Sequence, residues 1–209
     1  MVTSSIGEEA PEVGRAATRA LELARVLGDR AGELEASAFL YFHYEGGGHF
    51  SRLKEIAEAM LRGAEESGDP RLLVAAHYQF ANYLTFHTSD FMLAREHYEK
   101  ALAAYNSTSS PVDLRTRERF ANANAFLGWI LANLGFLDQA VVACRRAVEF
   151  AREQSTAFTV GWTLHLLGWV YRTRGDIEET LATAGALESL VEEYGLTDLH
   201  LGWILVARG

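Results

Sequence analysis

One stretch of sequence is used several times in this chain, and this repetition limits the fold more than any other feature. Leu127-Gly128-Trp129 recurs after 40 residues as Leu167-Gly168-Trp169, and the same shift relates Gly28-Asp29 to Gly68-Asp69. A third copy of the first motif, Leu201-Gly202-Trp203, follows the second by 34 residues. A period of this length is typical of solenoids, in which each unit packs only on its neighbours.

Each unit is predicted to form two helices, because its apolar residues recur at spacings of three and four. In the second helix of two units these residues are Leu53, Ile56, Ala57, Met60, Leu61 and Ala64, and Ala140, Ala143, Cys144, Ala147, Val148 and Ala151. No convincing run of alternating apolar and polar residues supports a strand. The chain is therefore expected to be all-α.

Helix ends are marked by capping residues that agree with this period. Asp69-Pro70 is an N-cap followed by proline at the first helical position, and Gly135 and Gly175 suit the residue after a helix. Asn106 to Val112, rich in Ser and Thr, is expected to be an exposed loop between units. The predicted helices span residues 12–27, 31–45, 51–67, 70–87, 91–105, 113–134, 137–154, 157–174, 177–194 and 197–208.

Charge and cysteine content exclude several classes of function. The 209 residues contain 19 Lys and Arg but 28 Asp and Glu, a net charge of −9, which disfavours direct contact with nucleic acid or an anionic membrane surface. Cys144 is the only cysteine, which excludes an internal disulfide and suits a reducing cytosol. Met1 to Glu9 lacks the features of a signal peptide, and no stretch is long enough to span a bilayer. We therefore expect a cytoplasmic protein that does not enter a membrane.

The repeated unit resembles the tetratricopeptide repeat. One unit has a small residue at each of the four places where that repeat requires one, namely Gly128, Gly135, Ala140 and Ala147. Small side chains there let the backbones of the two helices approach closely. The resemblance implies a right-handed superhelix of antiparallel helix pairs. It would form a single domain over residues 12–209, with about five repeats of which the first and last are incomplete, after a flexible N-terminus at 1–11.

A narrower resemblance concerns the run from Gly68 to Tyr78 and its continuation from Ala94 to Leu102. It is similar to the C-terminal repeat region of bacterial multidomain signalling ATPases of the nucleotidyl-cyclase or transcription-regulator type, over roughly residues 50 to 209. This resemblance implies a sensor or scaffold segment. The chain itself has neither a Walker-type phosphate loop nor a cyclase signature.

In the tetratricopeptide family the first helices line the concave face, and fixed positions of the repeat point into the groove. On this chain those positions are Tyr78, Asn82, Phe86, Asn122, Trp129, Asn133, Trp162, His165, Trp169, Arg172 and Trp203. The aromatic members would form a hydrophobic wall, and the polar members would supply directed hydrogen bonds to a protein, a peptide or a small-molecule effector. The alternative is that the tryptophans only fill space between repeats.

The last motif bears on association. Gly202 to Gly209 repeats Gly168 to Gly175, so the sequence stops where a second helix is expected. An uncovered apolar flank would result. We expect either a fragment of a longer protein or a homo-oligomer formed through the open C-terminal end.

No catalytic, cofactor or metal site is expected. His43 and His49 flank three glycines, but their spacing is not that of a zinc-binding helix, and the glycines are better explained as a turn between two helices. Cys144 falls on the apolar face of its helix and is expected in the core. Three functions remain: a binding segment of a signalling ATPase, a free-standing repeat adaptor and, least supported, an enzyme on a helical scaffold.

Overall fold

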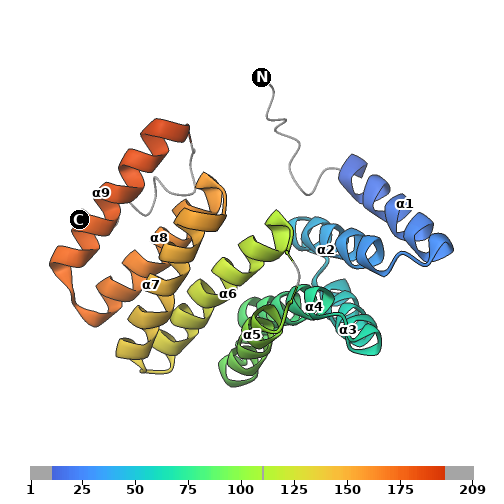
Figure 1. Ribbon diagram of the computed structural model, residues 1–209, viewed down its shortest axis with the longest axis horizontal. Coiled ribbons are helices and arrows are strands. Elements are labelled where there is room, and N and C mark those ends of the chain that lie inside the picture. Colours follow the sequence, from blue (N-terminus) through green and yellow to red (C-terminus); the bar gives the residue numbers. More distant parts are fainter. Residues whose placement is uncertain (1–10, 110, 196–209) are drawn as a thin grey trace.

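The computed structural model describes residues 11–109 and 111–195, and this part of the chain is helical without a strand. The helices follow one another round an arc with α1 and α9 at its ends (Figure 1). Their bounds are α1 Pro11–Leu27, α2 Arg30–Gly46, α3 Phe50–Ser67, α4 Pro70–Tyr83, the π-helical turn η1 Leu84–Thr88, α5 Phe91–Asn106, α6 Leu114–Asn133, α7 Leu137–Gln154, α8 Ala157–Arg174 and α9 Ile177–Tyr194.

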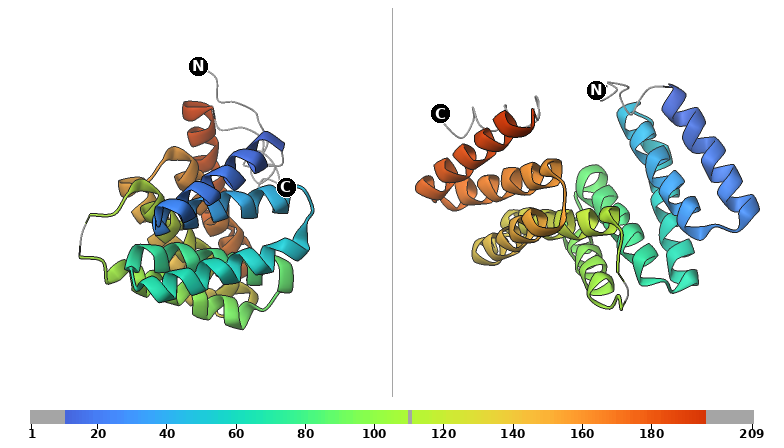
Figure 2. Two further views of the ribbon diagram at one scale, coloured as in Figure 1. Left: turned by 90° about the vertical axis from the view of Figure 1, so that its right-hand side faces the viewer. Right: turned by 45° about the horizontal axis from the view of Figure 1, so that its top comes forward.

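Helices that follow one another in the chain pack against each other. Four alternate helices also pack on one another in series. Helices α2, α4, α6 and α8, here called the A helices, form this additional series of contacts. Helices α3, α5, α7 and α9, here called the B helices, each follow an A helix in the chain and pack on it. Figure 2 shows the same stack of antiparallel pairs from two other directions. The all-α solenoid predicted from the sequence is therefore confirmed.

Capping residues start and end the helices where the sequence predicts. The Asp69 carboxylate accepts a hydrogen bond from the backbone N–H of Arg71 at 2.9 Å and so caps α4. The Thr156 hydroxyl caps α8 in the same way. Gly68 and Gly175, after α3 and α8, have φ of 66° and 89°, a left-handed conformation that glycine adopts without steric cost.

The crossing of α6 and α7 lies in the largest apolar cluster of the described residues. A Cβ on Gly128 would lie 2.3 Å from Sγ of Cys144 and 2.8 Å from the carbonyl oxygen of Ala140, so no larger residue fits without movement. Cys144 is fully buried, and burial raises the pKa of its thiol far above the ordinary range. The predicted core position of Cys144 is thus correct, and its thiol is held in the neutral form.

The helix predicted over 70–87 is interrupted. Regular α-helix ends at Tyr83, and five residues of π-helix follow. A π-helical turn accommodates one residue more than an α-helical turn. Within it the hydroxyls of Thr85 and Thr88 donate to the carbonyls of Ala81 and Leu84. The predicted segments at 1–11 and 197–208 lie wholly or almost wholly outside the described residues.

Ion pairs join two A helices that are not neighbours in the chain. Arg119 of α6 makes two hydrogen bonds to the Glu35 carboxylate of α2, at 2.6 and 2.9 Å, and Arg115 makes a third at 2.9 Å. Burial raises the pKa of Glu35, but the two arginines outweigh it and leave that pKa below its ordinary value. We call this group, Glu35 with Arg115 and Arg119, the ionic strap.

Candidate binding surface

Aromatic side chains from η1, α6 and α8 form a continuous row across the side of the stack that the A helices make up, here called the A side. The ring of Phe86 lies 5.5 Å from that of Phe126 and 6.2 Å from that of Trp129. Phe126 continues to Trp162 at 6.0 Å, and Trp129 continues to Trp169 at 5.7 Å. These spacings are those of interacting aromatic pairs. We call these five residues, together with Tyr78, the aromatic surface.

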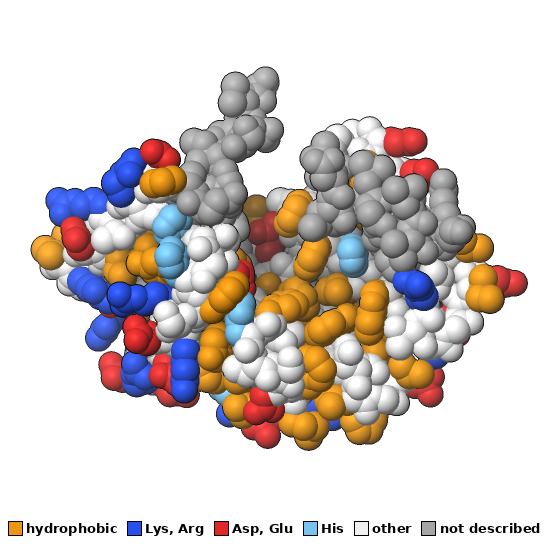
Figure 3. All heavy atoms as spheres, turned by 180° about the vertical axis from the view of Figure 1, so that it is seen from behind, with side chains coloured by type: hydrophobic (Ala, Val, Ile, Leu, Met, Phe, Trp, Pro, Cys, Tyr) orange, Lys and Arg blue, Asp and Glu red, His pale blue; other side chains and the backbone are white. Residues whose placement is uncertain are grey.

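The members of the aromatic surface differ in exposure. Phe86 is 51% exposed, whereas Phe126 is buried and serves as the floor. Trp129, Trp162 and Trp169 are partly buried, and all three pack against the main core. Figure 3, which views the molecule from behind, shows hydrophobic side chains gathered across the middle of one face, with most charged side chains towards its rim.

Two of the predicted asparagines make hydrogen bonds within the fold. Asn82 is only 6% exposed, and its Oδ1 accepts a hydrogen bond from the Tyr98 hydroxyl at 2.6 Å. Asn133 is exposed, but its amide donates to the carbonyl of Trp129 in its own helix at 2.8 Å. We therefore leave Asn82 out of the proposed contact surface and keep Asn133 at its edge.

Tyr78 and Asn122 lie deeper in the surface. The ring of Tyr78 is 6.4 Å from that of Phe126, and burial of its hydroxyl raises the pKa of Tyr78 despite the nearby amides of Asn82 and Asn122. Asn122 is partly buried, and its Oδ1 has no hydrogen-bond partner in the described part of the chain. Among the three predicted asparagines, Asn122 is the one with a buried acceptor oxygen that the described residues leave without a partner.

The remaining predicted residues lie along α8 and beyond it. The imidazole of His165 stacks on Trp162 with ring centres 5.5 Å apart and an angle of 29°. Arg172 is exposed in the last turn of α8. Trp203 lies outside the described residues. Most of the predicted positions from Tyr78 to Arg172 in the sequence therefore lie on the A side of the stack.

Sequence reasoning missed two contributors to this side. Phe126 stands three residues before Trp129, at a repeat position that the resemblance does not assign to the groove. Phe91, the first residue of α5, meets Trp129 edge-to-face at 5.7 Å. Phe126 could have been suspected only from the density of aromatic residues around it, because periodicity alone predicts a core residue there.

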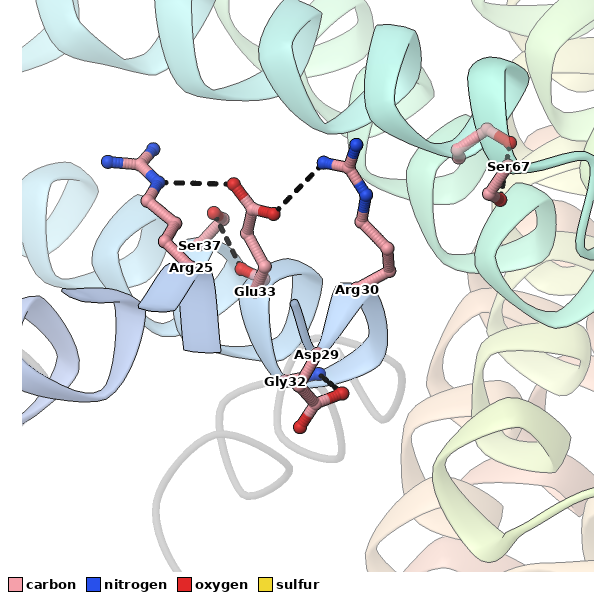
Figure 4. Close-up of polar contacts among 8 residues, drawn as sticks. Arg25, Asp29, Arg30, Gly32, Glu33, Ser37 and Ser67 are labelled. Atoms are coloured by element: carbon pink, nitrogen blue, oxygen red, sulfur yellow. Dashed lines mark hydrogen bonds and ion pairs between the residues drawn. The ribbon is translucent and has the colours of Figure 1, made fainter. Parts of the chain in front are cut away.

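Another hollow in the described part of the chain lies away from the aromatic surface. It has a volume of about 210 Å³ between α1, α2 and α3, with Leu34 and Met60 among the apolar residues that line it. Figure 4 shows its polar rim, where Arg25 and Arg30 both pair with Glu33, at 3.1 and 3.2 Å. Arg25 and Arg30 are already paired within the protein, so this hollow is a weaker candidate for an anionic effector.

The glycine-rich turn and two close histidine contacts are the remaining candidates for a metal site in the described residues. The three glycines at 46–48 end α2 and precede α3, with Gly48 at φ 74°, which is the predicted turn. His87 pairs with Glu45 at 2.7 Å, and His77 with His97 at 3.0 Å. In residues 11–109 and 111–195 no three His, Cys, Asp or Glu side chains gather closely enough to hold a metal ion. No helix in these ranges is both long and apolar enough to cross a bilayer.

Comparison with solved structures places the fold. The chain is similar to BtubC (BKLC) from P. vanneervenii, with a TM-score of 0.72 and 20% identity over 95% of this chain and 84% of that one. It is also similar to a putative kinesin light chain with nearly identical TPR-like repeats from Podosopora anserina, with a TM-score of 0.59 and 12% identity over 91% and 98% of the two chains. The fold is a tetratricopeptide-like solenoid. No family model and no curated protein matches the sequence.

Proposed function

We propose that the aromatic surface of this tetratricopeptide-like solenoid binds an extended segment of a partner protein. The observation that carries the proposal is the unbroken row from Phe86 through Trp129 to Trp169, which crosses the A side with ring spacings of 5.7 to 6.2 Å and reaches solvent along its length. Tryptophan is among the residues that most often dominate binding energy, because it buries a large area at little entropic cost.

The shape of the surface favours a chain segment over a small molecule. The aromatic residues spread over α4, η1, α6 and α8 and do not converge on one point. Asn133 is exposed next to Trp129, and its free amide oxygen can accept a hydrogen bond from the backbone of a segment laid along the row. Arg172 at the end of α8 adds a positive charge in a chain whose net charge is −9.

A binding measurement tests this function directly. Peptides selected from a random library on the purified chain would be titrated by calorimetry against the wild type, Trp129→Ala and Trp169→Ala. We expect each tryptophan variant to bind about tenfold more weakly or worse. Val142→Ala is the control, because Val142 is an exposed apolar residue on α7, a B helix. Equal affinity of all four proteins would contradict the proposal.

The sequence resemblance extends this proposal to a cellular role. In it the chain is the sensor or scaffold segment of a larger cytoplasmic signalling ATPase or transcription regulator, and partner binding at the aromatic surface controls the attached ATPase. A free-standing adaptor is the alternative. The reading frame around these residues distinguishes the two, because the first role requires an ATPase module in the same polypeptide. A screen of hydrolase substrates tests the enzyme hypothesis, and turnover abolished by His165→Ala would revive it.

A further inference from the structure

The indole N–H groups of Trp129 and Trp169 are hydrogen-bond donors that the fold leaves unused. Neither nitrogen makes a hydrogen bond within the described residues, and neither is among the buried polar atoms there that lack a partner. Both side chains are partly exposed, so the two donors are accessible at the aromatic surface. A covered indole N–H usually finds a hydrogen-bond partner. A ligand that covers these two rings should therefore supply acceptors.

The polar side chains beside these rings are richer in donors than in acceptors. The amide nitrogen of Asn133 is used by the carbonyl of Trp129, which leaves its Oδ1 as an acceptor. Arg172 is exposed, and its guanidinium, which carries donors only, makes no ion pair within the described residues. Phe86, at the other end of the row, has no polar group in its side chain. The best-matched ligand therefore offers many acceptors and few donors.

A proline-rich segment has this balance of donors and acceptors. Proline has a backbone carbonyl but no N–H, and a polyproline II helix makes no internal hydrogen bonds, so its carbonyls are free to accept. An α-helical ligand would use most of its carbonyls internally. A β-strand would bring as many N–H groups as carbonyls and would need a sheet edge, and the described part of this chain has no strand. The unused indole donors therefore favour the polyproline II form.

The spacing of the rings agrees with a segment of this form. The ring of Trp129 lies 6.2 Å from that of Phe86 and 5.7 Å from that of Trp169. A polyproline II helix rises about 3.1 Å per residue, so two residues span about 6 Å. Each ring of the row would thus face one pair of residues of the segment. Such a helix is already ordered before it binds, which lowers the entropic cost of laying it along the row.

Arg172 adds a charge requirement at one end of the row. Trp169 and Arg172 are three residues apart in α8 and so share a face of this helix. The neighbouring Arg174 pairs with Asp138 and Asp176, whereas Arg172 has no such partner within the described residues, and a carboxylate of the ligand would complement it.

We propose that the partner segment bound by the aromatic surface is proline-rich and carries an acidic residue at one end. The segment lies in polyproline II form over Phe86, Trp129 and Trp169, its carbonyls accept from the two indole N–H groups, and its carboxylate pairs with Arg172. This inference rests on the proposed function and adds the chemical class of the partner.

Calorimetric titration of the full chain with synthetic peptides tests the proposal. The probe is an oligoproline peptide that ends in glutamates, and the comparison peptides are the same oligoproline ending in lysines and an alanine-rich helical peptide ending in glutamates. We expect the probe to bind, the lysine peptide to bind about tenfold more weakly and the helical peptide not to saturate. Arg172→Gln should weaken the probe about tenfold. Arg152→Gln, at an exposed arginine of the B helix α7, is the control and should bind like the wild type.

The indole donors are observed directly by NMR of the nitrogen-labelled chain. On addition of the probe, the indole N–H signals of Trp129 and Trp169 should shift and exchange more slowly with water. Trp129→Phe and Trp169→Phe keep an aromatic ring and remove the donor, so each should weaken the probe about fivefold. Circular dichroism verifies that the variants are folded.

Failure of this inference can be distinguished from failure of the proposed function. No saturable binding of the probe at millimolar concentration, equal binding of the helical peptide, indole signals unchanged by the probe, or a probe affinity unaltered in Arg172→Gln would each overturn the proline-rich partner. If library-selected peptides without proline still bind and lose affinity in Trp129→Ala, the aromatic surface keeps its function and this inference alone is wrong. If neither the probe nor any selected peptide depends on Trp129 and Trp169, both proposals fail.

Discussion

At the scale of single residues, the chain contains a buried pair of imidazoles that makes its stability depend on pH. Nδ1 of His77 in α4 and Nδ1 of His97 in α5 are 3.0 Å apart, and each side chain is only 7% exposed. One ring must donate and the other accept, so the two imidazoles cannot both be protonated while this hydrogen bond is kept. Burial is the main cause that lowers the pKa of both histidines from 6.5 to about 4, and Lys100 adds to it.

The lowered pKa values of His77 and His97 mean that acid destabilises the folded chain. The pKa of each histidine is lower in the folded than in the unfolded chain, so stability is complete above about pH 6.5 and is lost as pH falls towards 4. One imidazole accounts for about 3 kcal/mol over that range. Glu35 and Asp69 also have a lowered pKa, but their ordinary values are 4.5 and 3.8, so they lose stability only at lower pH.

Urea unfolding between pH 7.5 and 4.5 measures this slope. We expect the unfolding free energy of the wild type to stay nearly constant down to about pH 6.5 and to fall from there to pH 4.5. The double variant His77→Asn/His97→Asn should remove most of the fall, because an amide pair can keep the hydrogen bond and does not titrate. His49→Gln changes an exposed histidine and should leave the slope unchanged. An unaltered slope in the double variant would refute the assignment.

At the scale of helices, the close crossing of α6 and α7 requires a glycine at position 128. Gly128→Ala would place a Cβ 2.3 Å from Sγ of Cys144, and the nearby carbonyl of Ala140 is backbone that cannot turn aside. We expect the free energy of unfolding to decrease by about 1–3 kcal/mol, the usual cost of overpacking. Gly63→Ala in α3 is the control, because nothing lies within 4 Å of its Cβ position.

This control should change stability in the opposite direction. Alanine has a higher helix propensity than glycine by about 1 kcal/mol, so Gly63→Ala is expected to be stabilising. Chemical denaturation of the three proteins compares the effects. If both substitutions stabilised the chain, the close approach of α6 and α7 would not exist in solution.

Most of the helices could be predicted because their determinants are local. Caps such as Asp69 and Thr156, left-handed glycines such as Gly68, and a strict apolar period all act within a few residues. The π-helical turn at 84–88 escaped prediction because one extra residue can be accommodated in the helix or in the loop, and local sequence does not decide which.

The candidate surface was less predictable than the helices. Repeat positions show which residues face the A side, but not how deeply each lies. The repeat position of Asn82 predicts a groove residue, yet its Oδ1 accepts a hydrogen bond from the hydroxyl of Tyr98 in α5. The repeat position of Phe126 does not predict a groove residue, yet its ring contacts both Phe86 and Trp162. Both outcomes depend on packing between residues distant in sequence, which a period does not record.

At the scale of the whole molecule, the ionic strap is the feature that departs from a simple solenoid. In such a solenoid each unit contacts only its neighbours, but Glu35 and Arg119 belong to units separated by a whole helix pair. The backbones of α2 and α6 do not pack closely, so long side chains alone make the link. The link consists of ion pairs, and the Arg115 guanidinium also lies over the ring of Phe39, 4.9 Å from its centre.

A double-mutant cycle with Glu35→Ala and Arg119→Ala measures the strap. We expect a coupling of about 1 kcal/mol in the free energy of unfolding, at the upper end for ion pairs because Arg119 is bidentate and only 15% exposed. The same cycle with Arg115, which is 55% exposed, should give a smaller coupling. Salt at about 1 M should weaken the Arg115 coupling more, because screening acts most on exposed charges. Zero coupling for Arg119 would mean that the repeats alone set the curvature of the arc.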